Sequence, residues 1–596
     1  MKVGYEKDTN VRFKEQMENH PTATKNLAGG LAFEIPDASV KLLTMIGGSF
    51  FNEPKYYNKG NTADPKKERE RISVLVNELA SKGVVKYHAL ALEDQAKEIV
   101  ETAIAIANSE NPRDLLALAH WCRTEMNIRT TPQVLLAIAA NNTNTKEWTR
   151  DYCTKVIKRP DEIRDVVAIY NWLFGKPFPN SLKKGICDAL SKVNEYGFLK
   201  YNTDTFPTFK DVILYTAGER KGRRSPLSKE VFEYVVNGKI VDESKTPVFA
   251  AREKFNKLSE FNDEAKEIAK NADITWEVLI SKFGGSKEAW EFIIDSWIKD
   301  DSDTSRNYMA IIRNLRNILK ADVSKDHVDK VCRVLKSGVK ESKQLPFRFW
   351  SAYTVVDGRP TIDRGGYGTQ DNNYTADAFK KKAVIKALND ALAGSAGDLK
   401  KIPGRTLIAA DNSGSMESRV SKDSNIMIND VANLLTSISG IVCENSIAGA
   451  FGTDWAEVNL SNLDIFADME KVKKANTKGM STNGYRIFEW LIKKNLKVDR
   501  VILLSDMQLW NSHGYSDAQL APSYKKYCKI NGNTYLHCID LAGHGMAVTP
   551  SGDKFVNLMS GFSEKILNRI NEFEGITESG EKTKQIPPIE YIRENF

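Results

Sequence analysis

The order of apolar and polar residues along the chain shows two textures. From about residue 70 to 345, apolar residues recur at steps of three and four, as they do in amphipathic helices with one buried face. Pro132 and Pro160 stand just inside the start of two such segments, where the missing N–H of proline costs no hydrogen bond. Short polar joints favour stacked, HEAT-like helical pairs, and an irregular all-α domain remains an alternative. The clearest predicted helices span 93–109, 113–126, 131–142, 159–175, 287–300, 308–320 and 326–338.

The second texture begins with a stretch rich in glycine and polar residues, 356–373, which predicts a linker. After a basic helix at 375–394, short apolar strands alternate with helices, and this alternation predicts a parallel sheet covered on both faces. Strands are predicted at 405–411, 446–452, 500–506 and 534–541, and helices at 425–442, 485–495 and 560–573. The polar tail from about residue 575 is expected to be loosely held.

The predicted fold class is therefore multidomain. An all-α HEAT-like repeat region is expected at 1–355, a linker at 356–374, and a doubly wound α/β domain at 375–596. No apolar run approaches the roughly 20 residues that cross a bilayer, and the N-terminus lacks a signal peptide, so a cytoplasmic protein without membrane contacts is expected. Singly scattered cysteines argue against disulfides and zinc sites.

Charge changes this picture only slightly. The net charge is +7, and all of the excess lies in residues 1–350, which is weak evidence for a nucleic-acid partner. Two groups of basic residues there are interpreted as contacts for a phosphate backbone, and the alternative for each is a solvated helix or loop surface. They are Lys183 with Lys184 on a short predicted helix, and the dense cluster Arg220, Lys221, Arg223 and Arg224.

Candidate metal chemistry follows the first predicted strand of the α/β domain. The loop Asp411-Asn-Ser413-Gly-Ser415 places one carboxylate and two hydroxyls together. A later strand ends in Asp506, and Thr482 lies between, so both are expected at the same sheet edge, where ligands of such folds gather. Hard oxygen ligands with few charges suit Mg²⁺ or Mn²⁺ and leave a coordination position open for a partner's carboxylate.

Two other interpretations of this loop exist. Its Ser and Asp side chains could cap the next helix without any metal. A phosphotransferase of the haloacid dehalogenase type also has an Asp at the end of its first strand, but it needs a second Asp where this chain has Ser413. No phosphate-binding G-x-x-x-x-G-K-[ST] loop and no G-x-S-x-G nucleophile elbow is present. Binding is favoured over catalysis, and we do not expect an enzyme.

Both halves resemble known families. The D-x-S-x-S loop, Thr482 and Asp506 come in the order of the metal-ion-dependent adhesion site of von Willebrand A and integrin I domains. Segments of the helical half are similar to the TROVE module of Ro proteins, in which that module precedes an A-type domain. The similar segments are TKNLAGGLAFEI (24–35), residues 126–132, PNSLKKGICDALSKVNEYGFLKYN (179–202), MAIIRNLRNILK (309–320) and SKQLPFRFW (342–350).

The Ro resemblance implies a monomeric ring of HEAT-like repeats closed by the A domain. It implies Y-like noncoding RNA on the outer surface, 3′ ends of misfolded RNAs in the central hole, and an exoribonuclease as a partner in RNA quality control. Arg129, Arg313 and Arg316 could line that hole or pair with acidic groups between repeats. The sequence departs from the family pattern at Phe209 and in YTAGERKGRRSP (215–226), so RNA in general is a firmer expectation than Y RNA.

The sequence thus predicts a non-catalytic RNA-binding scaffold with a divalent-metal site. The alternative is a metal-dependent protein-adhesion module in which the helices serve only as a spacer.

Overall fold

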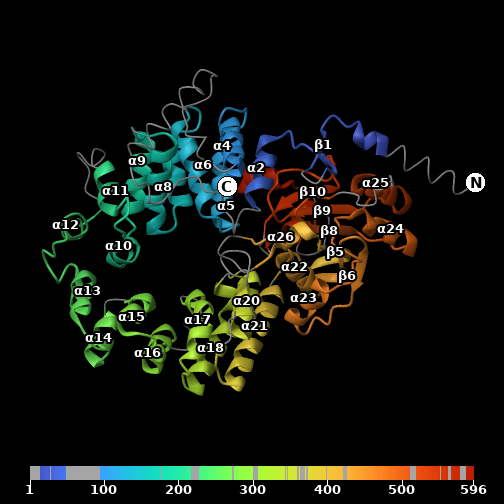
Figure 1. Cartoon of the computed structure of the whole chain (residues 1–596). Coiled ribbons are helices and arrows are strands. Elements are labelled where there is room, and N and C mark those ends of the chain that lie inside the picture. The colour runs from blue at the N-terminus through green and yellow to red at the C-terminus, as the bar shows by residue number, and fades with distance from the viewer. Residues whose placement is uncertain are drawn as a thin grey trace, which may run out of the picture. The chain divides into compact units, whose positions relative to one another are not determined.

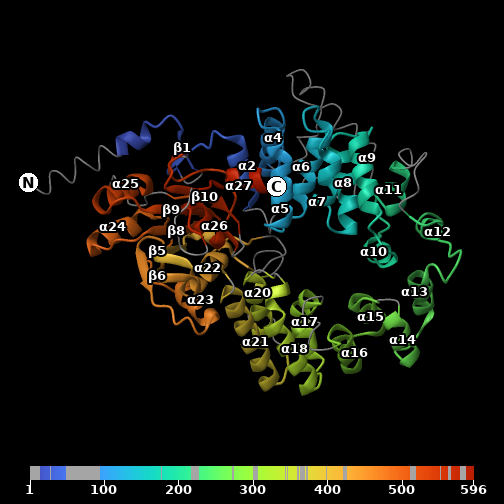
Figure 2. The same cartoon turned by 180° about the vertical axis from the view of Figure 1, so that it is seen from behind.

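The structure is a computed structural model of the 596-residue chain, and it forms two compact units. One unit comprises residues 1–52 and 285–591, and the other comprises residues 53–284 and 592–596. Figures 1 and 2 show the helices and strands of both units. The residues described are 14–596 apart from 27–28, 48–93, 176, 217–226, 272–273, 300–306, 343, 345, 359–360, 363–368, 371–373, 398, 421–425, 510–518, 551, 562–564 and 578–584.

The unit built on residues 53–284 is helical in every element that the structure describes. Its first helices pack side by side in pairs, α5 on α6, α6 on α8 and α7 on α9, as the helical rhythm of the sequence predicts. The helices are α4 (Asp94–Ala107), α5 (Asp114–Thr124), α6 (Thr130–Asn141), α7 (Thr149–Val156), α8 (Pro160–Leu173), α9 (Asn180–Leu190), α10 (Glu195–Tyr201), α11 (Phe209–Tyr215), α12 (Lys229–Asn237), α13 (Pro247–Lys257), α14 (Asp263–Asn271) and α15 (Trp276–Phe283).

The start of α8 shows how local sequence fixes a helix boundary. Pro160 occupies the first helical position, and the buried Glu162 carboxylate accepts hydrogen bonds from the backbone N–H groups of Lys158 (2.8 Å) and Arg159 (3.1 Å). This carboxylate satisfies two donors that have no partner within the helix. The helix therefore begins where the sequence predicts it.

Helix α9 lies against α7 because one glycine lets the two backbones approach. A Cβ atom at Gly185 would come within 2.2 Å of the Cys153 sulfur and 2.6 Å of its Cβ. Leu182 and Ile186, on the same side of α9, are buried. Lys183 and Lys184 are only half-buried, so the packing leaves part of both side chains accessible.

The last residues of the chain belong to this helical unit as well. Helix α27 (Pro588–Asn595) ends there, with the Arg593 guanidinium paired to the Asp114 carboxylate at 2.7 Å. The Tyr152 hydroxyl donates a hydrogen bond of 2.8 Å to the carbonyl of Phe596. The Phe596 ring meets the His120 ring edge-on, with centroids 5.1 Å apart. The chain thus returns at its end to the unit that its early helices form.

The other unit contains a second set of helices and an α/β domain. In α17 the buried side chains of Ile311, Ile312, Leu315, Ile318 and Leu319 form one face, and the basic residues lie on the other. The predicted linker contains a short antiparallel pair, β3 (Thr361–Ile362) with β4 (Thr369–Gln370). The helices are α16 (Lys287–Trp297), α17 (Tyr308–Lys320), α18 (Lys325–Ser337), α19 (Val339–Ser342), α20 (Pro346–Asp357) and α21 (Ala378–Gly397).

The α/β domain is built on a six-stranded sheet with the order β10-β9-β8-β5-β6-β7. Five strands are parallel, and the edge strand β7 runs antiparallel to β6, so the sheet of the predicted doubly wound α/β domain is mixed. All six residues of β8 are buried, as expected for a central strand covered on both faces. The strands are β5 (Ile402–Asp411), β6 (Cys443–Phe451), β7 (Trp455–Val458), β8 (Arg500–Ser505), β9 (Tyr535–Asp540) and β10 (Val556–Ser560).

Helices connect these strands and follow the last one. Two helices after β10 differ from the sequence prediction. The segment predicted as one helix at 560–573 begins with the last residue of β10, and the helix that the structure describes in it is Lys565–Glu574. The tail expected to be loose contains α27. The helices of this domain are α22 (Ile428–Val442), α23 (Ile465–Lys473), α24 (Tyr485–Lys494), α25 (Leu520–Asn531) and α26 (Lys565–Glu574).

The N-terminal residues pack with the α/β domain. They form a hairpin of β1 (Ala23–Lys25) and β2 (Leu31–Phe33), followed by α2 (Ala38–Gly47), which packs on β10. Phe33 is fully buried in a cluster with Ala521 and Ala547. The compact units therefore divide the chain elsewhere than at the predicted boundaries 355 and 375, since the first residues and the helices from α16 onward group with the sheet.

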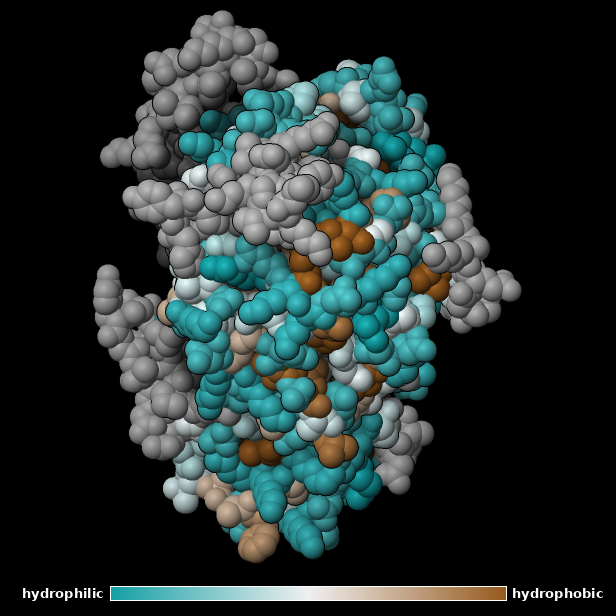
Figure 3. Space-filling view, turned by 90° about the vertical axis from the view of Figure 1, so that its right-hand side faces the viewer, coloured by the Kyte–Doolittle hydropathy of each residue, from teal (hydrophilic) through white to brown (hydrophobic). Residues whose placement is uncertain are grey.

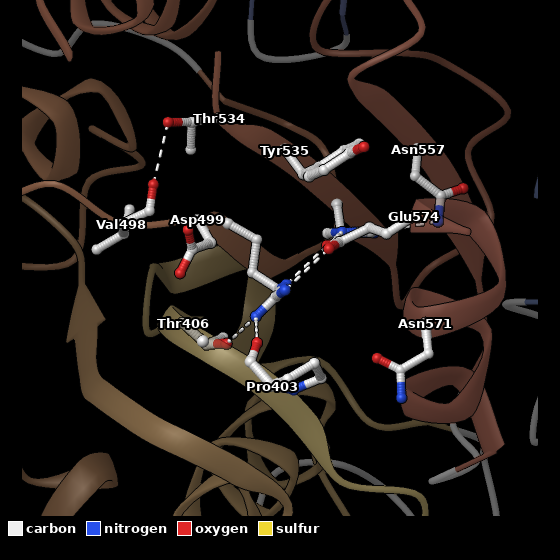
Figure 4. A network of polar contacts seen from close by, with 12 residues as sticks. Pro403, Thr406, Val498, Asp499, Thr534, Tyr535, Asn557, Asn571 and Glu574 are labelled. Atoms are coloured by element: carbon white, nitrogen blue, oxygen red, sulfur yellow. Dashed lines mark hydrogen bonds and ion pairs between the residues drawn. The ribbon is translucent and has the colours of Figure 1, made fainter. Parts of the chain in front are cut away.

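A buried polar network stabilises the edge of the sheet where β8 begins (Figure 4). The Arg500 guanidinium pairs with the Glu574 carboxylate at the end of α26 (2.6 Å) and donates to the Thr406 hydroxyl (2.8 Å). The His537 ring lies 2.8 Å from the same carboxylate. These charged partners lower the pKa of Glu574 against the effect of its burial, and burial lowers the pKa of His537. Their satisfied hydrogen bonds give them a structural role.

The face shown in Figure 3 is mostly hydrophilic, with small scattered apolar patches among the atoms that are not grey. No helix in the described part of the chain combines the length and apolar character that a bilayer crossing requires.

Candidate functional site

The first candidate site is at the carboxyl end of β5. Asp411 is the last residue of the strand and is fully buried. One of its oxygens accepts a hydrogen bond from the Ser413 N–H (2.9 Å), and the other accepts one from the Ser505 hydroxyl (2.6 Å). The Ser413 and Ser415 hydroxyl oxygens lie 3.3 Å apart, in a loop that continues into a short 3-10 helix, Gly414–Glu417. The predicted carboxylate and hydroxyls are therefore together on one loop.

Backbone hydrogen bonds place the segment of Thr482 beside this loop. The Gly414 N–H donates to the Met480 carbonyl (2.9 Å), and the Asn483 N–H donates to the Gly452 carbonyl (2.9 Å) just after β6. Thr482, between them, is buried. Asp506 directly follows β8, the neighbour of β5, and is also buried. The structure thus brings together the residue types that the sequence places at this edge.

The electrostatics of the edge follow from two buried carboxylates. Burial, together with the negative charge of Asp506, raises the pKa of Asp411 to about 7, although hydrogen bonds from Ser505 and Ser413 act in the opposite direction. A buried carboxylate with a second negative charge nearby is costly without a counter-charge. Either a proton or a bound cation would offset this charge.

Sequence reasoning did not single out Asp540, the last residue of β9. It is buried, and its carboxylate accepts hydrogen bonds from the backbone N–H groups of Ala542, Gly543 and His544, at 2.8, 2.8 and 2.9 Å. Burial raises its pKa to about 6, with the nearby charge of Asp506 adding to the effect. Its position at the end of the strand next to β8 was the available signal. Its hydrogen bonds show that it organises the turn after β9.

The donor set fits a hard divalent cation. It offers the carboxylates of Asp411 and Asp506 and the hydroxyls of Ser413, Ser415 and Thr482, which are oxygen donors of the kind that Mg²⁺ and Mn²⁺ prefer. Among the described residues there is no group of three or more His, Cys, Asp or Glu side chains that could hold a metal. A cation here would therefore depend on the hydroxyls and on water.

The predicted basic residues of the helical unit have different environments. Lys183 and Lys184 lie side by side on α9, and neither has an ion-pair partner among the residues that the structure describes. Arg220, Lys221, Arg223 and Arg224 lie outside the described residues.

Arg129 is an ion-pairing residue between helices. Its guanidinium lies 2.9 Å from the Asp161 carboxylate and 3.5 Å from that of Glu162, both in the first turn of α8. Glu162 also receives the Arg123 guanidinium at 2.8 Å. The pairing of Arg129 with acidic groups between repeats, one of the two roles considered for it, is therefore present.

Arg313 and Arg316 belong to a cluster that sequence reasoning recognised only in part. The Arg316 guanidinium lies 5.8 Å from the centre of the Tyr374 ring, and the Lys381 ammonium lies 6.0 Å from it. Arg348, on α20, has its pKa lowered by burial and by the positive charge of Arg313. Among the described residues, neither Arg313 nor Arg348 has a carboxylate partner. We call Arg313, Arg316, Arg348, Tyr374 and Lys381 the arginine–tyrosine cluster.

Together the two units define a class of protein: a helical-repeat region joined to an α/β domain of the von Willebrand A type, with an oxygen-rich loop at the carboxyl edge of its sheet. Comparison with family models agrees. The TROVE domain model matches residues 61–266 and 265–364, and the Ro60 vWA domain model matches residues 405–574. The chain belongs to the Ro family of TROVE-domain proteins, a family that binds RNA.

Individual relatives are more distant. The chain is 23% identical over 400 residues to telomerase protein component 1 of Mus musculus, and 22% identical over 349 residues to that of Rattus norvegicus. These matches cover 58% and 49% of this chain but only 15% and 13% of the relatives. The crystal structure of the Ro (RSR) protein of Deinococcus radiodurans shares the fold, with a TM-score of 0.56 and 13% identity over 88% of this chain and 97% of that one.

Proposed function

We propose that this protein binds RNA through two basic surfaces, one in each unit, and that it acts as a non-catalytic scaffold. Family membership gives the expectation, and the arginine–tyrosine cluster is the observation that carries the proposal. Arg313 and Arg348 lack carboxylate partners among the described residues, so the phosphates of an RNA strand would supply the missing negative charge. The exposed Arg313 would contact the RNA backbone. The Tyr374 ring and the Arg316 guanidinium beside it would stack against bases.

The finer assignment concerns which RNA binds where. We assign a structured, Y-like noncoding RNA to Lys183 and Lys184, and single-stranded 3′ ends of misfolded RNAs to the arginine–tyrosine cluster. A cytoplasmic protein that forms a monomeric ring and presents such RNAs to an exoribonuclease would act in RNA quality control. Ring closure, RNA identity and the enzyme partner are parts of this proposal.

RNA capture tests it directly. RNA that copurifies with the full chain should be enriched in one or a few structured species when sequenced. An RNA population that matched bulk cellular RNA would contradict the scaffold. The double variant Arg313→Glu with Arg348→Glu should lose binding of a single-stranded oligonucleotide. The matched control is Lys493→Glu with Lys494→Glu, which makes the same change of charge at two exposed lysines of α24 and should bind normally.

We propose that the carboxyl edge of the sheet binds Mg²⁺ or Mn²⁺, held by Asp411, Ser413, Ser415, Thr482 and Asp506. The donor types and the raised pKa of Asp411 support a cation there. Such a cation would leave a position for a partner's carboxylate, so the A-type domain would serve as a metal-dependent docking site. This is also the second candidate function, a protein-adhesion module with a helical spacer.

Calorimetry separates these functions. Asp411→Ala should abolish Mn²⁺ uptake by the full chain, and undiminished uptake would place any metal elsewhere. If the arginine variants left RNA binding unchanged while Asp411→Ala abolished binding of a protein partner, adhesion would be the better assignment.

A further inference from the structure

The turn that carries Asp506 is held in an unusual backbone conformation. Met507, the next residue, has φ of +59°, in the left-handed region that residues with a side chain rarely adopt. Such a conformation persists only where surrounding contacts enforce it. Inside the turn, the Met507 N–H donates to the Ser505 hydroxyl (3.1 Å), and the Gln508 N–H donates to the Asp506 carboxylate (3.0 Å).

One further contact to this turn comes from the N-terminal part of the chain. The side-chain amide of Asn26, which is buried, donates a hydrogen bond of 2.7 Å to the carbonyl of Leu509. Its carbonyl oxygen accepts a hydrogen bond of 2.8 Å from the N–H of Gly30. Asn26 therefore links the turn after β8 to the β1–β2 hairpin through both of its polar atoms.

The same hairpin holds the turn after β9. The Phe33 N–H donates to the Ala547 carbonyl (2.9 Å), and the Ala547 N–H donates to the Phe33 carbonyl (3.1 Å), so the two residues form an isolated antiparallel bridge. Gly545 comes so close to α2 that a Cβ atom on it would lie 2.7 Å from Met45. The turn that Asp540 organises from within is thus fixed from outside by residues of the N-terminal segment.

We propose that Asn26 is a positioning residue for the metal site, and that residues 23–26 and 29–47 act as a clamp on the two turns that follow β8 and β9. The clamp keeps the Asp506 carboxylate in place at the sheet edge, although it supplies no ligand itself. The segment lies outside both family-model matches, which begin at residues 61 and 405. The inference rests on the proposed metal function and deepens it.

The substitution Asn26→Asp isolates this role. It keeps an oxygen to accept from Gly30 and replaces the amide donor by a carboxylate that repels the Leu509 carbonyl. Loss of one hydrogen bond should lower Mn²⁺ affinity roughly 2- to 10-fold in calorimetry of the full chain. Amide hydrogen exchange of Met507 and Gln508 should become faster. Asn19→Asp makes the same change at an exposed position that precedes the clamp and should alter neither quantity.

Unchanged affinity and unchanged exchange in a folded Asn26→Asp protein would overturn the proposal. A second measurement needs no variant. Because coupling between sites is reciprocal, Mn²⁺ should slow amide exchange at Gly30 in the wild-type protein as well as at Ser413 and Gln508. Slowing at Ser413 and Gln508 without any at Gly30 would contradict the clamp.

Failure of the metal site itself is recognised separately. If Asp411→Ala left Mn²⁺ uptake unchanged, the proposed metal function would be wrong, while the exchange rates of Met507 and Gln508 in Asn26→Asp would still show whether Asn26 positions the turn.

Discussion

Asp411 has protein hydrogen-bond donors on both carboxylate oxygens, and it is fully buried beside a second negative charge. In the metal-free fold its pKa is raised to about 7, whereas an unfolded aspartate titrates near 4. Its contribution to stability is therefore fully present below about pH 4 and is lost as the pH rises through about 7. At neutral pH, ionisation of Asp411 therefore lowers the free energy of unfolding when no metal is bound.

This sign gives a prediction for Asp411→Asn. The variant removes the buried charge, so in the presence of a chelator it should unfold at a higher temperature than the wild-type protein at pH 8. The advantage should shrink as the pH falls towards 4, and Mn²⁺ should no longer stabilise the variant. Thermal unfolding at the two pH values measures both effects. A variant less stable than wild type at pH 8 would show that the charge is already compensated within the protein.

Single residues also mark the limit of sequence reasoning. The position of the oxygen-rich loop could be predicted because Asp411, Ser413 and Ser415 lie within five residues at the end of a strand. The partners of Arg129 could not be predicted, because Asp161 and Glu162 lie in another helix. The sequence does not distinguish them from other acidic residues. Arg348 and Tyr374 were missed as members of the arginine–tyrosine cluster because helix packing, which the sequence does not display, brings them together.

At the scale of elements, α9 depends on its close approach to α7. Gly185→Ala should destabilise the helical unit by about 1–3 kcal/mol, because the new methyl group would overlap the Cys153 side chain. The midpoint of urea unfolding measures this loss. Gly397→Ala, in a helix where a new methyl group meets nothing within 4 Å, is the control and should not destabilise the protein. An equal effect of both substitutions would contradict the packing argument.

Helix α26 is fastened to the sheet by charge. Glu574→Ala would leave the Arg500 guanidinium, which is 3% exposed, without its carboxylate, and removal of one partner of a buried pair typically costs about 3–5 kcal/mol. Replacing both residues by apolar ones should be less harmful than replacing Glu574 alone. Chemical denaturation of the two variants tests this order, and the reverse order would show that the pair itself provides the stability.

Elements were predicted well where a local pattern defines them. The helices α5, α8 and α17 and the strands β5 and β8 lie within a few residues of their predicted bounds. The strands β7 and β10 were missed because each is short and at an edge of the sheet, where pairing with one neighbour decides the conformation. The grouping of β2 with the α/β domain depends on the bridge from Phe33 to Ala547, more than 500 residues away. No pattern in the sequence near β2 indicates this contact.

On the scale of the whole molecule, the two basic surfaces lie in different units and should act on different ligands. Lys183→Glu with Lys184→Glu should weaken binding of a structured RNA and reduce the salt dependence of its affinity, because phosphate contacts are lost. It should leave a short single strand bound as before, whereas Arg313→Glu with Arg348→Glu should have the opposite selectivity. Filter binding at several salt concentrations distinguishes them. Equal losses on both RNAs in both variants would mean one shared surface.

The order of the units along the chain also has a consequence for synthesis. Residues 53–284 are inserted into the other unit, whose hairpin at 23–33 finds its partners Leu509 and Ala547 only near the end of the chain. During synthesis the inserted helices leave the ribosome first. About 500 residues must follow the hairpin before its partners Leu509 and Ala547 are both made. At 5–20 residues per second, that wait lasts roughly half a minute to two minutes. During this time the nascent protein would have the proposed RNA-binding surface of the helical unit before the proposed metal site has formed.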